Sequence, residues 1–322
     1  MSIKSVAVLR GGPSSEYEIS LETGSSVINA LRENGYRVKD IVITKKAEWL
    51  SEGFVKAPQT ALEAIDVVFV ALHGQYGEDG RVQRVLEQLQ IPFTGSRSLT
   101  SAIAFNKELT KQTLLRHGIK TPRYQKINKN NLPDLDEEVD RLLREVGREL
   151  VIKPVAGGSS IGVEYVNDAE TLRKELKKIL TDDKNIIVEE FVRGKEATVG
   201  IIENFRGNRF YPLPVVEIVS RGDSQIFTYE DKYINDTDEL VPGRFSYPEK
   251  STLTEFAEKV HSVLGCRSYS RSDFIVREGE VYFLEINTLP GLTPKSLFPK
   301  AALAVGLEFN QLVDHLVKTA TV

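Results

Sequence analysis

Cysteine is almost absent from this chain, because Cys266 is the one cysteine among 322 residues. An internal disulfide is therefore excluded, and the composition fits a protein of the reducing cytosol. No obvious base accompanies Cys266 in the sequence. We expect a buried structural thiol rather than a catalytic nucleophile.

Long apolar runs and basic blocks are also missing. The longest apolar runs, such as Val67–Leu72, have the length of a strand and fall far short of a membrane span. The apolar part of Met1–Arg10 is too short for a signal peptide. A net charge of −4 without a Lys/Arg cluster argues against nucleic acid as the main partner. We expect a soluble, cytoplasmic protein that binds neither membranes nor nucleic acid.

Residues 5–95 alternate between strand and helix patterns. Amphipathic helices are predicted from about Ser20 to Gly35 and again around Val82–Leu89. The apolar segments between them predict strands at Ser5–Leu9, Val38–Ile43, Val67–Leu72 and Ile91–Thr94. Near-continuous apolar strands between such helices indicate an α/β domain with a doubly wound parallel sheet. Ligands of such sheets bind at the carboxyl ends of the strands, where Gly11–Glu18 and His73–Gly74 fall.

Beyond Ser101 the pattern is α+β. Asn167 and Glu170 resemble a capping box that opens a helix. Other helices are predicted at Asn106–His117, Glu137–Glu145, Leu253–Leu264 and Leu297–Val305, and strands at Leu150–Lys153, Asn185–Phe191, Ala197–Ile202 and Leu213–Ile218. Residues 220–250 are polar and rich in turn formers, so we expect a long surface loop of the kind that often serves as a lid.

Two short acidic stretches near the C-terminus predict a metal site. Phe274–Val276 and Val281–Leu284 read as the two strands of a hairpin, which brings Asp273 opposite the end that carries Glu285 and Asn287. Glu285 and Asn287 are two residues apart and therefore point to the same face. Two carboxylates and an amide oxygen are hard ligands of the kind that Mg²⁺ shares with substrate phosphates. Solvated acids at a hairpin end are the alternative, and this set favours the metal.

Two further segments have features of nucleotide binding. Lys153–Gly162 places a lysine at a strand end before a turn of small residues, whose N–H groups can approach phosphate oxygens. Its spacing differs from that of a P-loop. Ile187–Glu196 is a strand followed by an acidic turn. The exposed backbone of the strand could bind the edge of an adenine, and an acid in the turn could bind the ribose hydroxyls. Taken singly, an ordinary Gly/Ser turn and an ordinary acidic surface turn explain these two segments as well.

The order of these parts resembles the ATP-grasp superfamily and, more closely, the D-alanine–D-alanine ligase family. The resemblance spans Val6 to about Leu316. Its motifs are Gly11–Leu21, His73–Gly80, Lys107, Lys153 with its glycine turn, Glu189–Glu196, Tyr229–Tyr233, Asp273 and Glu285–Thr293. The resemblance implies a substrate-binding α/β domain at residues 1–97, a central ATP-grasp subdomain at 98–186 and a catalytic ATP-grasp subdomain at 187–322 with the lid loop.

The resemblance also implies how ATP is held. Lys107 and Lys153 would contact the phosphates, Lys232 would reach the γ-phosphate when the lid closes, and Glu196 would bind the ribose. Adenine would be held, largely through backbone groups, by Glu189, Glu190, Phe191 and Val192. Two Mg²⁺ or Mn²⁺ ions would be bound by Asp273, Glu285 and Asn287. Such ions neutralise and align the transferred phosphoryl group.

The implied reaction has two steps. The carboxylate of one D-alanine attacks the γ-phosphate to give an acylphosphate and ADP, and the amine of a second D-alanine then displaces phosphate. Glu18 would pair with the first ammonium, beside His73, and would form a hydrogen-bonded set with Ser159 and Tyr233. Arg271 and the N–H of Gly291 would stabilise the oxyanion, and Ser296 with the N–H of Leu297 would bind the second carboxylate. His73, at a strand end, suits a structural role equally well.

Other functions remain possible from the residues. A related ATP-grasp ligase acting on D-lactate or D-serine would keep the same nucleotide residues and differ at Glu18, Tyr233 or Ser296. The resemblance implies that Tyr233 favours D-alanine, because related ligases that make D-alanyl-D-lactate commonly have histidine at this position. A non-catalytic nucleotide-binding protein would have lost lysines or metal ligands, and all are present. A dinucleotide site is disfavoured because Gly11-Gly12 lacks the third glycine of G-x-G-x-x-G. The family resemblance implies a homodimer.

Overall fold

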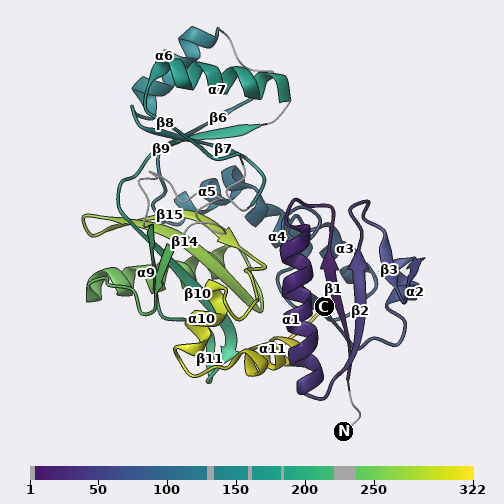
Figure 1. The fold of residues 1–322 in the computed structure, drawn as a ribbon. Helices are drawn as coiled ribbons and strands as arrows, with labels where there is room; N and C mark the ends of the chain where they lie inside the picture. The colour runs from purple at the N-terminus through teal and green to yellow at the C-terminus, as the bar shows by residue number, and fades with distance from the viewer. Residues whose placement is uncertain (1–3, 129–133, 159–161, 183–184, 221–236) are drawn as a thin grey trace.

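A computed structural model describes residues 4–128, 134–158, 162–182, 185–220 and 237–322 (Figure 1). Three residues expected in the site, Ser159, Lys232 and Tyr233, lie outside these ranges. The described residues form three sheets, which follow one another along the chain. Within the same ranges, no helix is both long and apolar enough to cross a membrane.

The first sheet has the strand order β4-β3-β2-β1-β5. The bounds are β1 Ser5–Gly11, β2 Arg37–Ile43, β3 Trp49–Ser51, β4 Phe54–Lys56 and β5 Val67–Val70. β1 pairs in parallel with both β2 and β5, as predicted, whereas β3 and β4 add an antiparallel edge. The strand expected at Ile91–Thr94 is reduced to isolated bridges of Phe93, a parallel one with Val68 and an antiparallel one with Thr321. Pro92, which has no N–H to continue the ladder, accounts for the difference.

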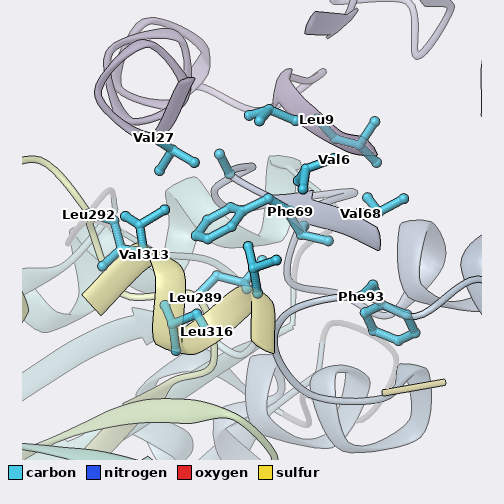
Figure 2. Close-up of a cluster of buried hydrophobic side chains, with 14 of the residues drawn as sticks. Val6, Leu9, Val27, Val68, Phe69, Phe93, Leu289, Leu292, Val313 and Leu316 are labelled. Carbon is cyan, nitrogen blue, oxygen red and sulfur yellow. The ribbon is translucent and has the colours of Figure 1, made fainter. Parts of the chain in front are cut away.

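Helices from both ends of the sequence cover this sheet. Their bounds are α1 Tyr17–Glu33, α2 Pro58–Ala61, α3 Arg81–Gln88 and, near the C-terminus, α11 Phe309–Lys318. The helix that follows α3, α4 Ser98–Phe105, packs against α3 and against the third sheet. α11 packs against α1 and β5. In Figure 2, Val27 of α1, Phe69 of β5 and Leu316 of α11 lie in one apolar cluster. The C-terminal helix therefore completes the core of the N-terminal sheet.

The central sheet is antiparallel, with the order β6-β9-β7-β8. The bounds are β6 Tyr124–Ile127, β7 Leu150–Pro154, β8 Glu164–Val166 and β9 Ile186–Glu190, and those of its helices are α6 Leu135–Glu145 and α7 Ala169–Asp182. Both helices lie on the same side of the sheet (Figure 1). The prediction of Asn167 as the cap of α7 is wrong: Asp168, one residue nearer the helix, accepts the N–H of Thr171 at 2.8 Å.

The third sheet has the order β13-β12-β10-β14-β15, with β11 beside β10. The bounds are β10 Lys195–Phe205, β11 Asn208–Pro212, β12 Val216–Ser220, β13 Thr237–Leu240, β14 Tyr269–Arg277 and β15 Glu280–Asn287. Three helices pack around it: α5 Lys107–Leu115, α9 Tyr247–Val263 and α10 Leu297–Leu303. Cys266 is buried, as expected, and burial raises the pKa of its thiol to about 12.

The expectation of one continuous loop over residues 220–250 is wrong in its second half. Residues 237–240 form β13, which pairs with β12, and α9 begins at Tyr247. Ser246 and Glu249 form a reciprocal capping box at that helix start. Such a box satisfies N–H groups of the first turn, so the helix begins inside the polar stretch. The first half of the expected loop, residues 221–236, lies outside the described residues.

The three-part division of the chain remains a proposal. β9 lies across the expected border between residues 186 and 187, and along its length it pairs with β6 and β7. A border after Glu190 therefore suits the central sheet better.

Candidate active site

The acidic hairpin forms as predicted. In the register of β14 and β15, Asp273 lies opposite Glu285 and Arg271 lies opposite Asn287. The register shifts between Asp273 and Phe274, because Leu284 of β15 has no partner on β14. Asn287 donates its amide N–H to the Asp273 carboxylate at 3.1 Å, so these two side chains meet on one face of the sheet. Local pairing therefore gathers the three expected metal-binding side chains at one edge of the hairpin.

Positive side chains surround these acids. Arg271 donates two hydrogen bonds to Asp273, each of 2.9 Å, and Lys107 Nζ lies 3.2 Å from Glu285 Oε2. Burial lowers the pKa of Arg271, but the charge and hydrogen bonds of Asp273, together with the charges of Glu285 and Glu78, raise the pKa above its ordinary value. Thr198 on β10 also donates to Asp273, at 2.6 Å. Sequence reasoning missed Thr198, which is recognisable only from the pairing of β10 with β14.

The donor set suits a divalent ion that also binds another molecule. Among the residues that the structure describes, no group of three or more His, Cys, Asp or Glu side chains is placed to hold a metal. The hairpin offers two carboxylates and one amide instead. A hard cation here completes its coordination with further oxygen atoms, as Mg²⁺ does with substrate phosphates. The residues therefore fit a metal shared with a phosphorylated ligand.

The two expected phosphate-binding lysines lie at the same cleft. Lys107, at the start of α5, donates to the carbonyl of Gly157 at 2.8 Å and also contacts Glu285. Lys153, on β7, donates to Glu189 Oε2 at 3.0 Å. Lys107 therefore joins the glycine turn of the central sheet to the metal-binding hairpin.

Lys111 is a site residue that sequence reasoning missed. It is fully buried, and its Nζ lies 3.1 Å from the other carboxylate oxygen of Glu189, Oε1. Its signal in the sequence is the spacing from Lys107: residues four apart share one face of a helix. That spacing predicts that both lysines face the same way, but only the tertiary structure brings Glu189 between Lys111 and Lys153.

The expected adenine segment lies at the end of β9. The N–H groups of Glu190 and Phe191 donate to the carbonyls of Arg123 and Glu149, at 2.9 and 2.8 Å. The Glu190 side chain accepts from Arg123, both at its backbone N–H and at its guanidinium. These groups hold the segment in place. An adenine ring bound here would meet the apolar side chains of Phe191 and Val192, which line the cleft.

A single cleft between the central and third sheets collects most of the predicted nucleotide and metal residues. It is lined by Lys107, Lys153, Glu189, Glu190, Phe191, Val192, Glu196, Arg271, Asp273, Glu285 and Leu297, together with apolar residues such as Ile275 and Leu284. Positive charge, negative charge and an apolar wall occur in one depression. Such a site can hold a charged nucleotide beside a carboxylate that is being activated.

Ser296 and Gly291 lie next to each other near the start of α10. Ser296 is the residue before the helix, and its Oγ lies 2.9 Å from Thr293 Oγ1 and accepts the N–H of Thr293 at 3.2 Å. A Cβ added to Gly291 would lie 3.0 Å from Ser296 Oγ. The backbone of Gly291 thus approaches the hydroxyl of Ser296 closely. Glu18 lies in the first turn of α1, which begins three residues earlier than predicted.

His73 connects the N-terminal and C-terminal parts of the chain. Its Nε2 lies 2.9 Å from Thr23 Oγ1 and its Nδ1 lies 3.1 Å from the Leu289 carbonyl oxygen. Burial lowers the pKa of His73, but the hydrogen bond and charge of Glu78, the charge of Glu16 and the Leu289 carbonyl together leave the pKa raised. Both ring nitrogens have partners within the fold. This favours a structural role for His73 over a role beside the first D-alanine.

Comparison with known proteins gives consistent matches over the whole chain. The D-ala D-ala ligase N-terminus family matches residues 5–60 and 51–96, and the D-ala D-ala ligase C-terminus family matches residues 114–318. A D-alanine–D-alanine ligase of Carboxydothermus hydrogenoformans is 39% identical over 97% of this chain and 96% of its own.

Solved structures of ligases are also similar to this chain over nearly its whole length. The Bacillus anthracis D-alanine–D-alanine ligase complexed with ATP is 32% identical, with a TM-score of 0.79 over 98% of this chain and 97% of that chain. The VanG D-Ala:D-Ser ligase of Enterococcus faecalis is 27% identical, with a TM-score of 0.84 over 99% of both chains.

Proposed function

The chain belongs to the D-alanine–D-alanine ligase family, and from that premise we propose how its residues perform the reaction. The protein is an ATP-dependent carbon–nitrogen ligase that joins two D-alanine molecules through a D-alanyl phosphate, with release of ADP and phosphate. Its product serves peptidoglycan precursor synthesis. The observation that carries the assignment of the site is the meeting of Lys107, Lys153 and the acidic hairpin at one cleft.

ATP lies in this cleft, with its phosphates toward Lys107 and Lys153. The adenine base lies against Phe191 and Val192 and is held by backbone groups of Glu189–Val192, while Glu196 binds the ribose. The placement of these residues along the cleft wall supports this orientation. Lys232, outside the described residues, would add a positive charge at the γ-phosphate.

Asp273, Glu285 and Asn287 hold the divalent metal, for which we propose two Mg²⁺ ions, replaceable by Mn²⁺. When bound, the metal neutralises the negative charge of the phosphates during phosphoryl transfer. Arg271 and Lys107 already contact Asp273 and Glu285, so these side chains have their places in the cleft set by protein contacts. Thr198 orients Asp273 from the neighbouring strand.

The protein's own groups hold the two amino acids. Glu18 pairs with the ammonium of the first D-alanine, and Ser159 and Tyr233 join it in closing the site. The carboxylate of this first substrate attacks the γ-phosphate. Water must be excluded at this stage, because an acylphosphate hydrolyses readily. The close approach of the Gly158 Cα to Glu16, where an added Cβ would lie 3.1 Å from Glu16 Oε2, supports contact between the two loops that enclose this region.

The second step forms the peptide bond. The amine of the second D-alanine attacks the acyl carbon, and the tetrahedral intermediate then breaks its bond to the phosphate oxygen and releases phosphate. Arg271 with the N–H of Gly291 stabilises the oxyanion. Ser296 and the N–H of Leu297 hold the carboxylate of this second substrate. The proximity of the Gly291 backbone to Ser296 Oγ supports a shared role of these groups.

We also propose a cytoplasmic location and a homodimer, both from the family. ADP release from purified protein tests the function, with ATP, Mg²⁺ and D-alanine set against L-alanine, D-serine and D-lactate. ADP formation with D-alanine alone is expected, and faster turnover when D-serine or D-lactate is added to D-alanine would overturn the choice of second substrate. Size-exclusion chromatography with light scattering tests the dimer.

A further inference from the structure

Three charged side chains from three elements form a buried row behind the nucleotide cleft. Lys111 comes from α5, Glu189 from β9 and Lys153 from β7. The Lys111 and Glu189 side chains are 0% and 1% exposed, whereas that of Lys153 is 15% exposed. Each carboxylate oxygen of Glu189 faces one ammonium group, at 3.1 Å for Lys111 and 3.0 Å for Lys153. Of these three side chains, that of Lys153 is the most exposed.

The charges of this row do not cancel. Glu189 with Lys153 alone would form a neutral pair, and a neutral pair attracts a triphosphate weakly. Lys111 supplies a second positive charge, so the row carries one net positive charge. Lys111 is held in place by Thr121, to whose Oγ1 it donates at 2.6 Å. Lys153 and Glu189 both line the cleft, and Lys153 is the more exposed of the two, so the excess positive charge is available at Lys153.

A fully buried lysine is costly to the fold. The desolvation of an ammonium group costs several kcal/mol, and a well-packed apolar side chain in place of a buried charge network is often neutral or stabilising. Burial lowers the pKa of Lys111 to about 8, although the charge of Glu189 acts to raise it. Packing alone therefore does not explain why a charged lysine occupies this buried position.

We propose that Lys111 is a positioning residue for ATP: it balances Glu189, so that Glu189 fixes the Lys153 ammonium at the cleft without cancelling its charge. The proposal rests on the proposed function, because it assumes that Lys153 contacts the phosphates. Lys111 itself is screened from the cleft by Glu189 and touches no nucleotide. Its effect is confined to the phosphate end of the ligand.

Calorimetric titration of the full chain with ATP and with adenosine tests the proposal. Lys111→Gln retains a hydrogen-bonding side chain but removes the charge, and we expect ATP to bind about tenfold more weakly or worse, with adenosine unaffected. Lys111→Gln/Glu189→Gln removes both charges and leaves Lys153 with its own. Glu189 is assigned to adenine through its backbone, which the substitution keeps, so we expect this double variant to recover most of the ATP affinity that Lys111→Gln loses, as a non-additive rescue. Lys120→Gln, at an exposed lysine paired with Glu280, is the control and should change the affinity for neither ATP nor adenosine.

The outcomes separate this inference from the function itself. Unaltered ATP binding by Lys153→Gln would overturn the phosphate site on which the proposal rests. Weak binding by Lys153→Gln together with normal binding by Lys111→Gln would overturn the role of Lys111 alone. Equal loss of ATP and adenosine in Lys111→Gln would show a structural role and also overturn it. If Lys111→Gln does not fold, the double variant decides: tenfold weaker ATP binding in it contradicts the charge-balance argument.

Discussion

At the scale of single residues, Glu285 shows how charge and geometry act together. Its carboxylate lies at the hairpin edge opposite Asp273 and 3.2 Å from Lys107. Glu285→Gln keeps the size of the side chain and removes the charge that a divalent ion needs. We expect ADP formation to fall by roughly a hundredfold or more, with partial recovery at higher Mg²⁺ concentration. Steady-state kinetics over a range of Mg²⁺ concentrations measures both effects.

The control for that prediction lies on the same strand. Glu280 is at the turn of the hairpin, where it pairs with Lys120 on the surface. Glu280→Gln should leave kcat and the Mg²⁺ dependence unchanged. A Glu285→Gln variant with normal turnover would show that the metal is bound elsewhere.

Lys111 leads to a prediction on pH. Its pKa is lowered to about 8 by burial, while Glu189 raises it and Lys153 and Lys107 lower it. The Tyr124 ring also faces Lys111, with its centroid 5.8 Å from Nζ. Because the lysine is charged below its pKa and neutral above it, the positive charge is present at pH 7 and lost as the pH rises through 8. We expect the Kd for ATP to rise over that range, and Lys111→Gln to flatten the profile. A rise of the same size in Lys111→Gln would assign the titration to another group.

At the scale of elements, a glycine allows α10 to pack on the third sheet. A Cβ added to Gly200 of β10 would lie 2.7 Å from a ring carbon of Phe298 and 2.9 Å from Leu213 Cδ1. Gly200→Ala should therefore cost about 1–3 kcal/mol of stability through overpacking. Since α10 follows Ser296 and begins with Leu297, its displacement should raise the KM for the second D-alanine more than the KM for ATP.

Thermal unfolding and two-substrate kinetics measure this effect. Phe298→Leu in the Gly200→Ala background removes the crowding ring and should recover part of the lost Tm. If Gly200→Ala raised both KM values equally, α10 would not be specific to the second substrate.

At the scale of the whole molecule, the last helix ties the two ends of the chain together. Tyr36 donates to Asp314 at 2.7 Å, and Leu316 of α11 is fully buried in the cluster around Phe69 (Figure 2). Leu316→Ala leaves a cavity there, and we expect a loss of about 2–5 kcal/mol. Chemical denaturation measures the free energy of unfolding. Leu303→Ala, at a side chain that is 53% exposed, is the matched control and should change stability by less than about 0.5 kcal/mol.

Local features of the fold and site were predictable from the sequence because neighbours along the chain determine them. The opposition of Asp273 and Glu285 follows from strand periodicity and one short turn, and the structure has that register. The buried state of Cys266 followed from its isolation. Errors arose where one residue competes with the pattern around it, as Pro92 does in the expected strand 91–94 and Ser246 does at the start of α9.

The sequence by itself determined the family, through the resemblance of its ordered motifs. Through composition and spacing it also determined the alternation of strands and helices and the residue types of the site. Only the tertiary structure decided which groups far apart in the sequence contact the same carboxylate. Lys111 and Lys153 both contact Glu189, and Thr198 of β10 donates to Asp273 of the neighbouring strand β14. Contacts of this kind arise when separately formed elements pack. Spacing along the chain says which way a side chain faces on its own element, and the partner it meets is set by how the elements come together.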